Sequence, residues 1–128
     1  MSLSIHTENT TSDRATLRLR GRLDASTFGA FDEAAQPLLS GIAEGGTLVL
    51  DLAALEYISS AGLRSFAKAR KAMRERHGHT LVLDPQPQVR KVLDIVKAVP
   101  VKEIFASVRE LDAYLDTIQQ QVMQASED

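Results

Sequence analysis

Two adjacent serines, Ser59 and Ser60, lie at the junction of two segments with different periodicity, and this junction constrains the fold more than any other feature. Before it, residues 47–52 form a short apolar run rich in β-forming side chains, which predicts a buried strand. After it, apolar side chains recur at helical spacing, at Leu63, Phe66, Ala67 and Met73. The chain therefore predicts a strand, a loop that carries both hydroxyls, and a helix that begins at that loop.

The serine pair has two interpretations at such a helix start. A serine is a preferred N-cap, because its hydroxyl oxygen accepts a hydrogen bond from an amide of the first helical turn. The unpaired N–H groups and partial positive charge of a helix N-terminus also accommodate a phosphate, so an exposed serine there suits phosphorylation or nucleophilic chemistry. The residues alone favour the plain cap and leave the second interpretation open.

The other segments predict a single α/β domain. Residues 4–8 and 15–20 alternate apolar and polar side chains on either side of a turn-rich stretch, which predicts an antiparallel hairpin. Helices alternate with strands after this hairpin, so we expect a mixed, mostly parallel sheet covered by about four helices. Ser26 and Thr27 are a suitable N-cap pair for the first helix. That helix is expected to present to the core Phe28, Phe31, Ala35 and Leu38 or Leu39.

The end of the chain predicts one short strand and one helix. Pro100 leaves room only for a short edge strand near Ile104. Ser107 and Glu110 form a capping box that opens a last helix. We expect one domain over residues 1–128, with an ordered core over about 3–118 and a frayed C-terminal tail.

Composition excludes several kinds of site. A chain of 128 residues is long enough to bury a core without covalent or metal staples. It has no cysteine, which excludes disulfides and thiolate metal sites. His6, His77 and His79 have no partner ligands at useful spacing, so we expect no metal and no cofactor.

Charge and hydropathy give expectations about partners and location. The formal net charge of −2 gives no general attraction to nucleic acid. No apolar run approaches the ~18 residues that span a bilayer, and no secretory signal is visible at the N-terminus. We therefore expect a soluble, cytoplasmic monomer that binds neither nucleic acid nor membrane.

Two motifs together resemble the signature of a known family. Residues 57–64, Tyr-Ile-Ser-Ser-Ala-Gly-Leu-Arg, resemble a motif of the STAS domain, in particular of the small bacterial anti-anti-sigma factors (anti-sigma factor antagonists). Residues 19–24, Leu-Arg-Gly-Arg-Leu-Asp, resemble that family's hydrophobic-x-Gly-x-Leu-Asp motif. The motifs occur in the family's order and at similar separation, and the resemblance covers about Ser4 to about Leu115. It implies a STAS-like α/β fold, which agrees with the pattern of predicted elements.

The resemblance implies a binding switch that is a kinase substrate and not an enzyme. In such partner-switching circuits, the unmodified protein binds an anti-sigma factor that is also a serine kinase. Phosphorylation of the antagonist releases it from the kinase, and a PP2C-type phosphatase resets the switch. The resemblance matches Ser60 to the phosphoacceptor, two residues before Gly62. Ser59, where the best-known members carry aspartate, is the second candidate.

The expected partner-binding surface surrounds this loop. Asp24 ends a predicted strand, where it is either a turn carboxylate or part of a functional loop. The resemblance places Asp24 beside Ser60. Arg64 follows Ser60 by four residues, so both lie on one face of the helix, where Arg64 contacts either a phosphate on Ser60 or an acidic patch on a partner. The expected partner-binding residues are Asp24, Ser59, Ser60, Gly62 and Arg64.

The rest of that helix is basic. We interpret this as a solvated face and not as a nucleic-acid site, because no aromatic side chains are interleaved with the cations. One acidic residue, Glu75, accompanies Arg64, Lys68, Arg70, Lys71, Arg74 and Arg76.

Other classes of function stay open. A serine hydrolase with Ser60 as nucleophile would need a base, and no histidine is placed by a recognisable motif; the first glycine of Gly-x-Ser-x-Gly is also missing. A phospho-aspartate receiver using Asp51 would need an acidic pair after the first strand, and none is present. An unmodified structural or sensory STAS module is the third alternative. We expect no catalytic residues.

Overall fold

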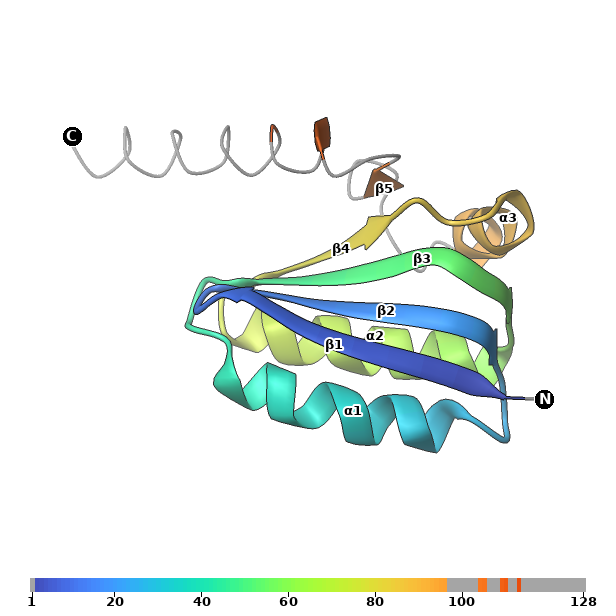
Figure 1. The fold of residues 1–128 in the computed structure, drawn as a ribbon, viewed down its shortest axis with the longest axis horizontal. Helices are drawn as coiled ribbons and strands as arrows, with labels where there is room; N and C mark the ends of the chain where they lie inside the picture. Colours follow the sequence, from blue (N-terminus) through green and yellow to red (C-terminus); the bar gives the residue numbers. More distant parts are fainter. Residues whose placement is uncertain (1, 97–103, 106–108, 111–112, 114–128) are drawn as a thin grey trace.

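Five strands form one mixed sheet in the computed structural model of the chain, which describes residues 2–96, 104–105, 109–110 and 113. The first two strands are antiparallel and the others add in parallel, in sequence order across the sheet (Figure 1). This confirms the predicted hairpin, the mostly parallel sheet and the short strand near Ile104. The strands are β1 (Leu3–Thr11), β2 (Arg14–Leu23), β3 (Thr47–Ile58), β4 (His79–Leu83) and β5 (Ile104–Phe105).

Three described helices accompany the sheet: α1 (Phe28–Gly41), α2 (Ser60–Glu75) and α3 (Pro87–Val96). α1 and α2 lie side by side against one face, and α3 lies beside the carboxyl-terminal part of β3 (Figure 1). The fourth predicted helix, from Ser107, and the expected end of the ordered core near residue 118 fall largely outside the described residues. Within the part of the chain that the structure describes, every helix is too short or too polar to cross a membrane.

The core lies between the sheet and the pair α1 and α2. Phe31 of α1 and Phe66 of α2 are both fully buried, and their ring centroids are 5.4 Å apart. Each large apolar side chain buried here stabilises the fold by about 1.5–3 kcal/mol. The fully buried leucines of β2 and β3 are Leu17, Leu19, Leu23, Leu48, Leu50, Leu52 and Leu55.

One predicted core residue is on the surface. Phe31, Ala35 and Leu38 are buried as predicted, but Phe28 is 40% exposed. Phe28 lies in the first turn of α1 and faces the start of α2, where Ala61 is too small to cover the ring. The prediction for Phe28 was therefore wrong, because helical spacing gives the direction of a side chain but not the size of its neighbour.

The outer edge of β3 is closed by side chains beyond the end of β4. β4 pairs with β3 only from Thr47 to Asp51, although β3 continues to Ile58. Gln86 Nε2 then donates to the carbonyl of Ala53 at 2.9 Å, and Gln88 Nε2 donates to the carbonyl of Glu56 at 3.2 Å. The segment before and at the start of α3 thus satisfies backbone acceptors that a longer β4 would have bonded.

Candidate functional site

The loops that follow β2 and β3 are joined at one end of the sheet. Leu23 pairs with Ile58 in the parallel register, and the backbone N–H of Ser59 donates to the carbonyl of Leu23 at 2.9 Å. Asp24 follows Leu23 directly, and Ser60 follows Ser59. The structure therefore brings the two sequence motifs together, because both strands run the same way and end at the same edge.

Gly62 allows this close approach. A β-carbon at position 62 would lie 2.8 Å from Leu23 Cγ, 2.9 Å from Ile58 Cγ1 and 3.0 Å from the carbonyl oxygen of Leu23. Only glycine therefore lets the first turn of α2 rest on the ends of β2 and β3. Gly62 is buried, so its contribution to any binding surface is to position the serine loop and not to contact a partner.

The two serines differ sharply in their surroundings. Ser60 is the first residue of α2 and is exposed. Ser59 is the N-cap residue in an extended conformation, and its carbonyl accepts a hydrogen bond from the Leu63 amide at 2.9 Å. Its hydroxyl makes no capping bond; Ser59 Oγ is buried and has no hydrogen-bond partner among the residues described. The plain-cap interpretation, in which a serine hydroxyl caps this helix, therefore does not describe Ser59.

Asp24 organises the turn between β2 and α1. Its Oδ1 accepts hydrogen bonds from Ser26 Oγ at 2.7 Å, from Ser26 N at 3.0 Å and from Thr27 Oγ1 at 3.2 Å. The pKa of Asp24 is lowered mainly by the hydrogen bonds from the Ser26 hydroxyl and the Ser26 amide. The bond from Thr27 and the nearby Arg22 lower it further, whereas desolvation, a smaller effect than either Ser26 bond, raises it. Asp24 is therefore a carboxylate at neutral pH. These contacts fit the turn-carboxylate interpretation and put a fixed negative charge at this end of the sheet.

The predicted capping pair works differently from expectation. Thr27 is the N-cap of α1, but its side chain makes no capping bond. Thr27 Oγ1 instead accepts from the amide of Asp24 at 2.9 Å, and its single proton is shared between the carbonyl of Arg22 at 2.9 Å and Asp24 Oδ1 at 3.2 Å. These bonds stabilise the turn that follows β2, and this turn fixes the position of Asp24.

Arg22 and Tyr57 also belong to the site, although neither residue was predicted from the sequence. The guanidinium carbon of Arg22 lies 4.2 Å from the centre of the Tyr57 ring, and Arg22 Nε lies 3.8 Å from Asp24 Oδ2. Arg22 and Tyr57 are paired residues of β2 and β3, so the register places them on the same face. Each lies within one of the two recognised motifs, and this position in the sequence could have marked both as residues of the site.

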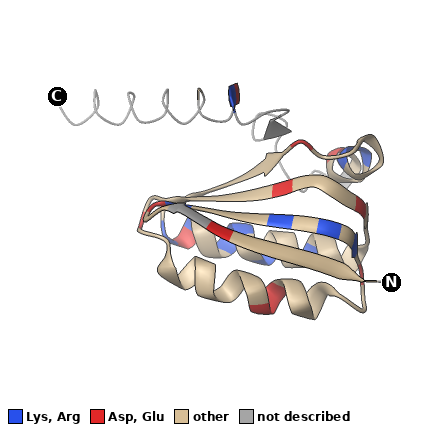
Figure 2. Ribbon diagram, viewed as in Figure 1, with Lys and Arg blue, Asp and Glu red and all other residues tan. Residues whose placement is uncertain are grey.

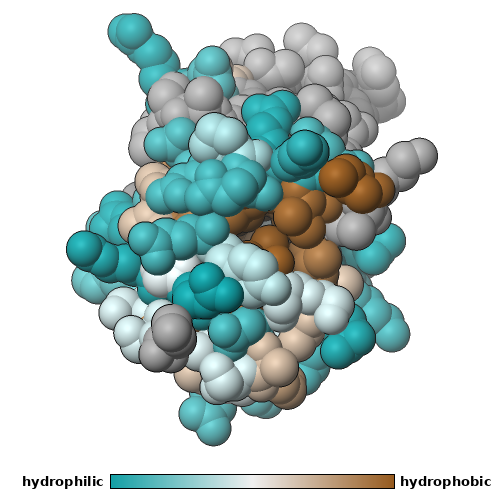
Figure 3. All heavy atoms as spheres, turned by 90° about the vertical axis from the view of Figure 1, so that its right-hand side faces the viewer, coloured by the Kyte–Doolittle hydropathy of each residue, from teal (hydrophilic) through white to brown (hydrophobic). Residues whose placement is uncertain are grey.

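Arg64 lies on the exposed side of α2, one turn after Ser60. Together with Phe28, Ala61 and Lys68 it lines a hollow of about 210 Å³ between the first turns of α1 and α2. Seen from the loop end, the surface is largely polar around a smaller apolar area (Figure 3). The exposed large hydrophobic side chains among the described residues are Phe28, Tyr57 and Ile95.

The histidines do not support nucleophilic catalysis at Ser60. His77 follows α2 and its Nδ1 lies 2.9 Å from Glu44 Oε1. The 16 residues of α2 separate this contact from Ser60 by about 24 Å at 1.5 Å per residue. His79 begins β4 opposite Thr47, at the same far end, and His6 pairs with Arg18 within the β1–β2 ladder. Within the described ranges, no group of three or more His, Cys, Asp or Glu side chains could hold a metal ion.

Comparison with known proteins matches most of the chain to one family. The model of the STAS domain matches residues 5–111. BtrV of Bordetella bronchiseptica, whose name assigns it to the anti-sigma factor antagonists, is 44% identical over 48 residues. That segment covers 38% of this chain and 41% of BtrV, so the match spans less than half of the relative.

Solved structures show the same fold at low sequence identity. The anti-sigma factor antagonist SpoIIAA in its unphosphorylated form is 20% identical, with a TM-score of 0.74 over 89% of this chain and 97% of that one. The Bacillus SpoIIAA structure in the phosphorylated form is 18% identical, with a TM-score of 0.69 over 88% of this chain and 99% of that one.

Proposed function

This chain belongs to the STAS domain family, and from that premise we propose that it is an anti-sigma factor antagonist in a partner-switching circuit. In its unphosphorylated form it binds an anti-sigma factor that is also a serine kinase. Phosphorylation of Ser60 releases the kinase, and a PP2C-type phosphatase restores the binding form. The protein acts as a cytoplasmic monomer, as a substrate and not as an enzyme.

The contrast between the two hydroxyls carries this proposal. Ser60 is exposed at the start of a long helix, whereas Ser59 Oγ is buried. A kinase must bring the γ-phosphate in line with an accessible hydroxyl, so the exposed serine is the better acceptor. SpoIIAA, which shares this fold, has been solved in a phosphorylated form, which supports phosphorylation of a protein with this fold.

The expected effect of the phosphate falls on the partner and not on the fold. A phosphoserine carries about −1.5 to −2 charges at neutral pH. At a helix N-terminus a negative charge stabilises the helix by roughly 0.3–1 kcal/mol. A carboxylate of the partner about 6 Å away would be repelled by on the order of 3 kcal/mol per unit charge at an effective dielectric constant of ~20. The ionised Asp24 adds to this negative field.

The test is to locate the phosphate after incubation with the cognate kinase and ATP. That kinase is sought as a histidine-kinase-like ATPase encoded beside this chain. Intact-mass and fragment-ion measurements should show one phosphate on Ser60. Ser60→Ala should take up none, while the matched variant Ser59→Ala should take up the same amount as the wild type. If phosphate uptake is lost in Ser59→Ala and kept in Ser60→Ala, the phosphoacceptor is Ser59 and the assignment to Ser60 is wrong. Absence of uptake in every variant would favour an unmodified sensory STAS module.

A further inference from the structure

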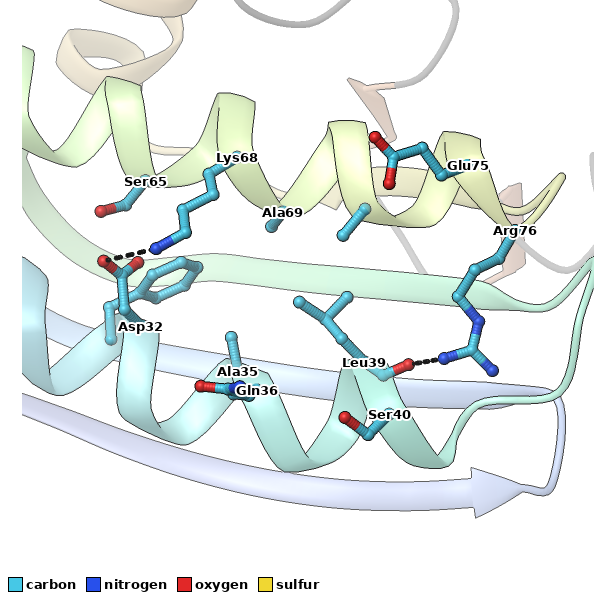
Figure 4. A pocket seen from close by; sticks show the side chains of 12 residues that line it. Asp32, Ala35, Gln36, Leu39, Ser40, Ser65, Lys68, Ala69, Glu75 and Arg76 are labelled. Atoms are coloured by element: carbon cyan, nitrogen blue, oxygen red, sulfur yellow. Dashed lines mark hydrogen bonds and ion pairs between the residues drawn. The ribbon is translucent and has the colours of Figure 1, made fainter.

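A groove with an apolar floor runs between α1 and α2. It has a volume of about 420 Å³, and Figure 4 shows the side chains that line it from both helices. Toward the start of α2 it continues into the hollow beside Phe28, because both spaces are lined by Asp32, Ser65 and Lys68. The combined groove therefore begins at Ala61, the residue after Ser60, and runs along α2. Its apolar floor is formed by Phe31, Ala35, Leu39, Ala69 and Ala72.

Arg76 closes the far end of this groove. Its guanidinium donates a hydrogen bond to the carbonyl of Leu39 (Figure 4) and another to the carbonyl of Ile42, at the end of α1. The guanidinium of Arg76 is therefore bonded within the fold, and it joins the end of α2 to the end of α1. The spacing of the two helices is thus held at this end, which favours binding because less ordering is needed when a ligand enters.

The rim of the groove on α2 is positively charged toward the start of the helix. Arg64 and Lys68 line this part, and the Lys68 side chain is 76% exposed, whereas the acidic Glu75 lines the far end of the groove (Figure 4). Lys68 Nζ lies 3.9 Å from Asp32 Oδ2 across the groove (Figure 4). An ion pair this exposed contributes at most about 1 kcal/mol, so an incoming carboxylate can replace Asp32 at little cost.

The charge of α2 as a whole has the same sign. Within Ser60–Glu75 there are five Lys or Arg residues and one Glu, and Figure 2 marks the positions of the basic residues along this helix in blue. The complete chain carries −2, so the remainder of the protein is net acidic. α2 therefore stands out as a basic surface on an acidic protein, which attracts acidic partners.

We propose that the groove between α1 and α2 binds an acidic amphipathic helix of a protein partner. The apolar side chains of that helix enter the groove at i, i+3, i+4 and i+7 spacing, with Phe28 at its open end. Carboxylates on the flank of the helix pair with Arg64 and Lys68. The inference rests on the proposed function in one respect: a phosphate on Ser60 would add negative charge at the mouth of the groove and repel the same acidic helix.

A peptide experiment tests the groove without the cognate kinase. The probe is a fluorescent amphipathic peptide of about 18 residues, five helical turns, with leucines on one face and glutamates on its flanks. A twin peptide carries lysine at every glutamate, and a DNA duplex of similar length serves as a second competitor. Binding to the full, isotope-labelled chain is followed by fluorescence polarisation and by amide chemical shifts.

Matched variants distinguish binding in the groove from general attraction to the positive charge of α2. Arg64→Glu/Lys68→Glu reverses two charges on the rim, and Lys71→Glu/Arg74→Glu makes the same change on exposed residues of α2 outside the groove lining. Ala72→Leu fills the groove without changing charge, and Ala67→Leu adds the same atoms to an exposed position of α2. Circular dichroism melting confirms that each variant folds.

The proposal predicts that the acidic peptide binds at least about tenfold more tightly than its lysine twin, a difference of ~1.4 kcal/mol. Arg64→Glu/Lys68→Glu and Ala72→Leu should each weaken binding about tenfold, while their two matched controls stay close to the wild type. Shifts should cluster at Phe28, Leu39 and Lys68. Equal losses in both charge-reversal variants, shifts elsewhere, preference for the DNA duplex, or self-association through the groove would each overturn it. A failure here leaves phosphate uptake at Ser60 untouched, so the two proposals fail separately.

Discussion

The amide of Ser59 donates to the carbonyl of Leu23 at 2.9 Å, and this bond joins the start of α2 to the end of β2. It links the two sequence motifs directly through the backbone, and the packing of Gly62 against Leu23 and Ile58 adds to this link. A phosphate on Ser60 would act on a fixed arrangement of charges.

Replacing Gly62 should test how tightly this junction is packed. In Gly62→Ala the new methyl group meets Leu23 and Ile58 at 2.8–3.0 Å, so we expect the free energy of unfolding to fall by about 1–3 kcal/mol. Gly29→Ala is the control, because a β-carbon at that helical position has nothing within 4 Å, and it should stabilise α1 by up to about 1 kcal/mol. Urea denaturation measures both. Equal stability of Gly62→Ala and the wild type would contradict the packing described here.

The buried hydroxyl of Ser59 leads us to expect an unusually small change in stability when this N-cap residue is replaced. Replacing a capping serine by alanine normally costs about 0.5–2 kcal/mol. Ser59 makes no capping bond, so Ser59→Ala should change the free energy of unfolding by less than ~0.5 kcal/mol or increase it, since a buried unpaired hydroxyl is removed. Thr27→Ala removes a hydroxyl that has two backbone partners and should cost about 1 kcal/mol. A larger loss for Ser59→Ala than for Thr27→Ala in thermal melts would refute this.

The pH dependence of stability should report on Asp24. Its pKa is lower in the folded than in the unfolded chain, because Ser26 donates two hydrogen bonds to the carboxylate. The resulting stability is fully present above the unfolded pKa and is lost as the pH falls through the folded pKa. Ser26→Ala should move the pKa of Asp24 back toward its ordinary value, as followed by carboxyl carbon resonances in a pH titration. An unchanged pKa in that variant would exclude the Ser26 hydroxyl as the main cause, since the amide of residue 26 is kept.

A charge at Ser60 should change binding and leave the fold intact. Ser60→Glu places a carboxylate at the exposed start of α2, where the helix dipole favours it. We expect an unchanged or slightly higher melting temperature, and binding to the kinase weakened about tenfold, a loss of ~1.4 kcal/mol. Ser60→Ala should bind as tightly as the unmodified protein. Isothermal titration calorimetry measures both variants, and loss of folding in Ser60→Glu would show that the switch acts by another route.

Periodicity predicted the elements of this fold well, because each depends on local sequence. The strand before Ser59, the helix after it, the hairpin and the short strand at Ile104 all follow from apolar spacing and breakers. The two motifs also marked the end of the sheet that carries the loops.

The details of the site depend on contacts between distant segments, and these were not predictable. The burial of Ser59 Oγ results from the approach of β2 to the start of α2. The stacking of Arg22 on Tyr57 follows from the register between two strands that are far apart in sequence. Phe28 is exposed because of the small residue on another helix. Each of these features requires knowledge of two segments at once.

The glutamine side chains on the edge of β3 have a consequence for solubility. A bare strand edge can add a strand from another molecule, which is the first step of fibril growth. Gln86 and Gln88 occupy the carbonyls of Ala53 and Glu56 with side-chain amides, which pair with the edge but cannot themselves continue a sheet. They therefore cover the part of β3 that extends beyond the end of β4. This stretch of β3 should therefore not serve as a start point for aggregation for as long as these two amides stay in place.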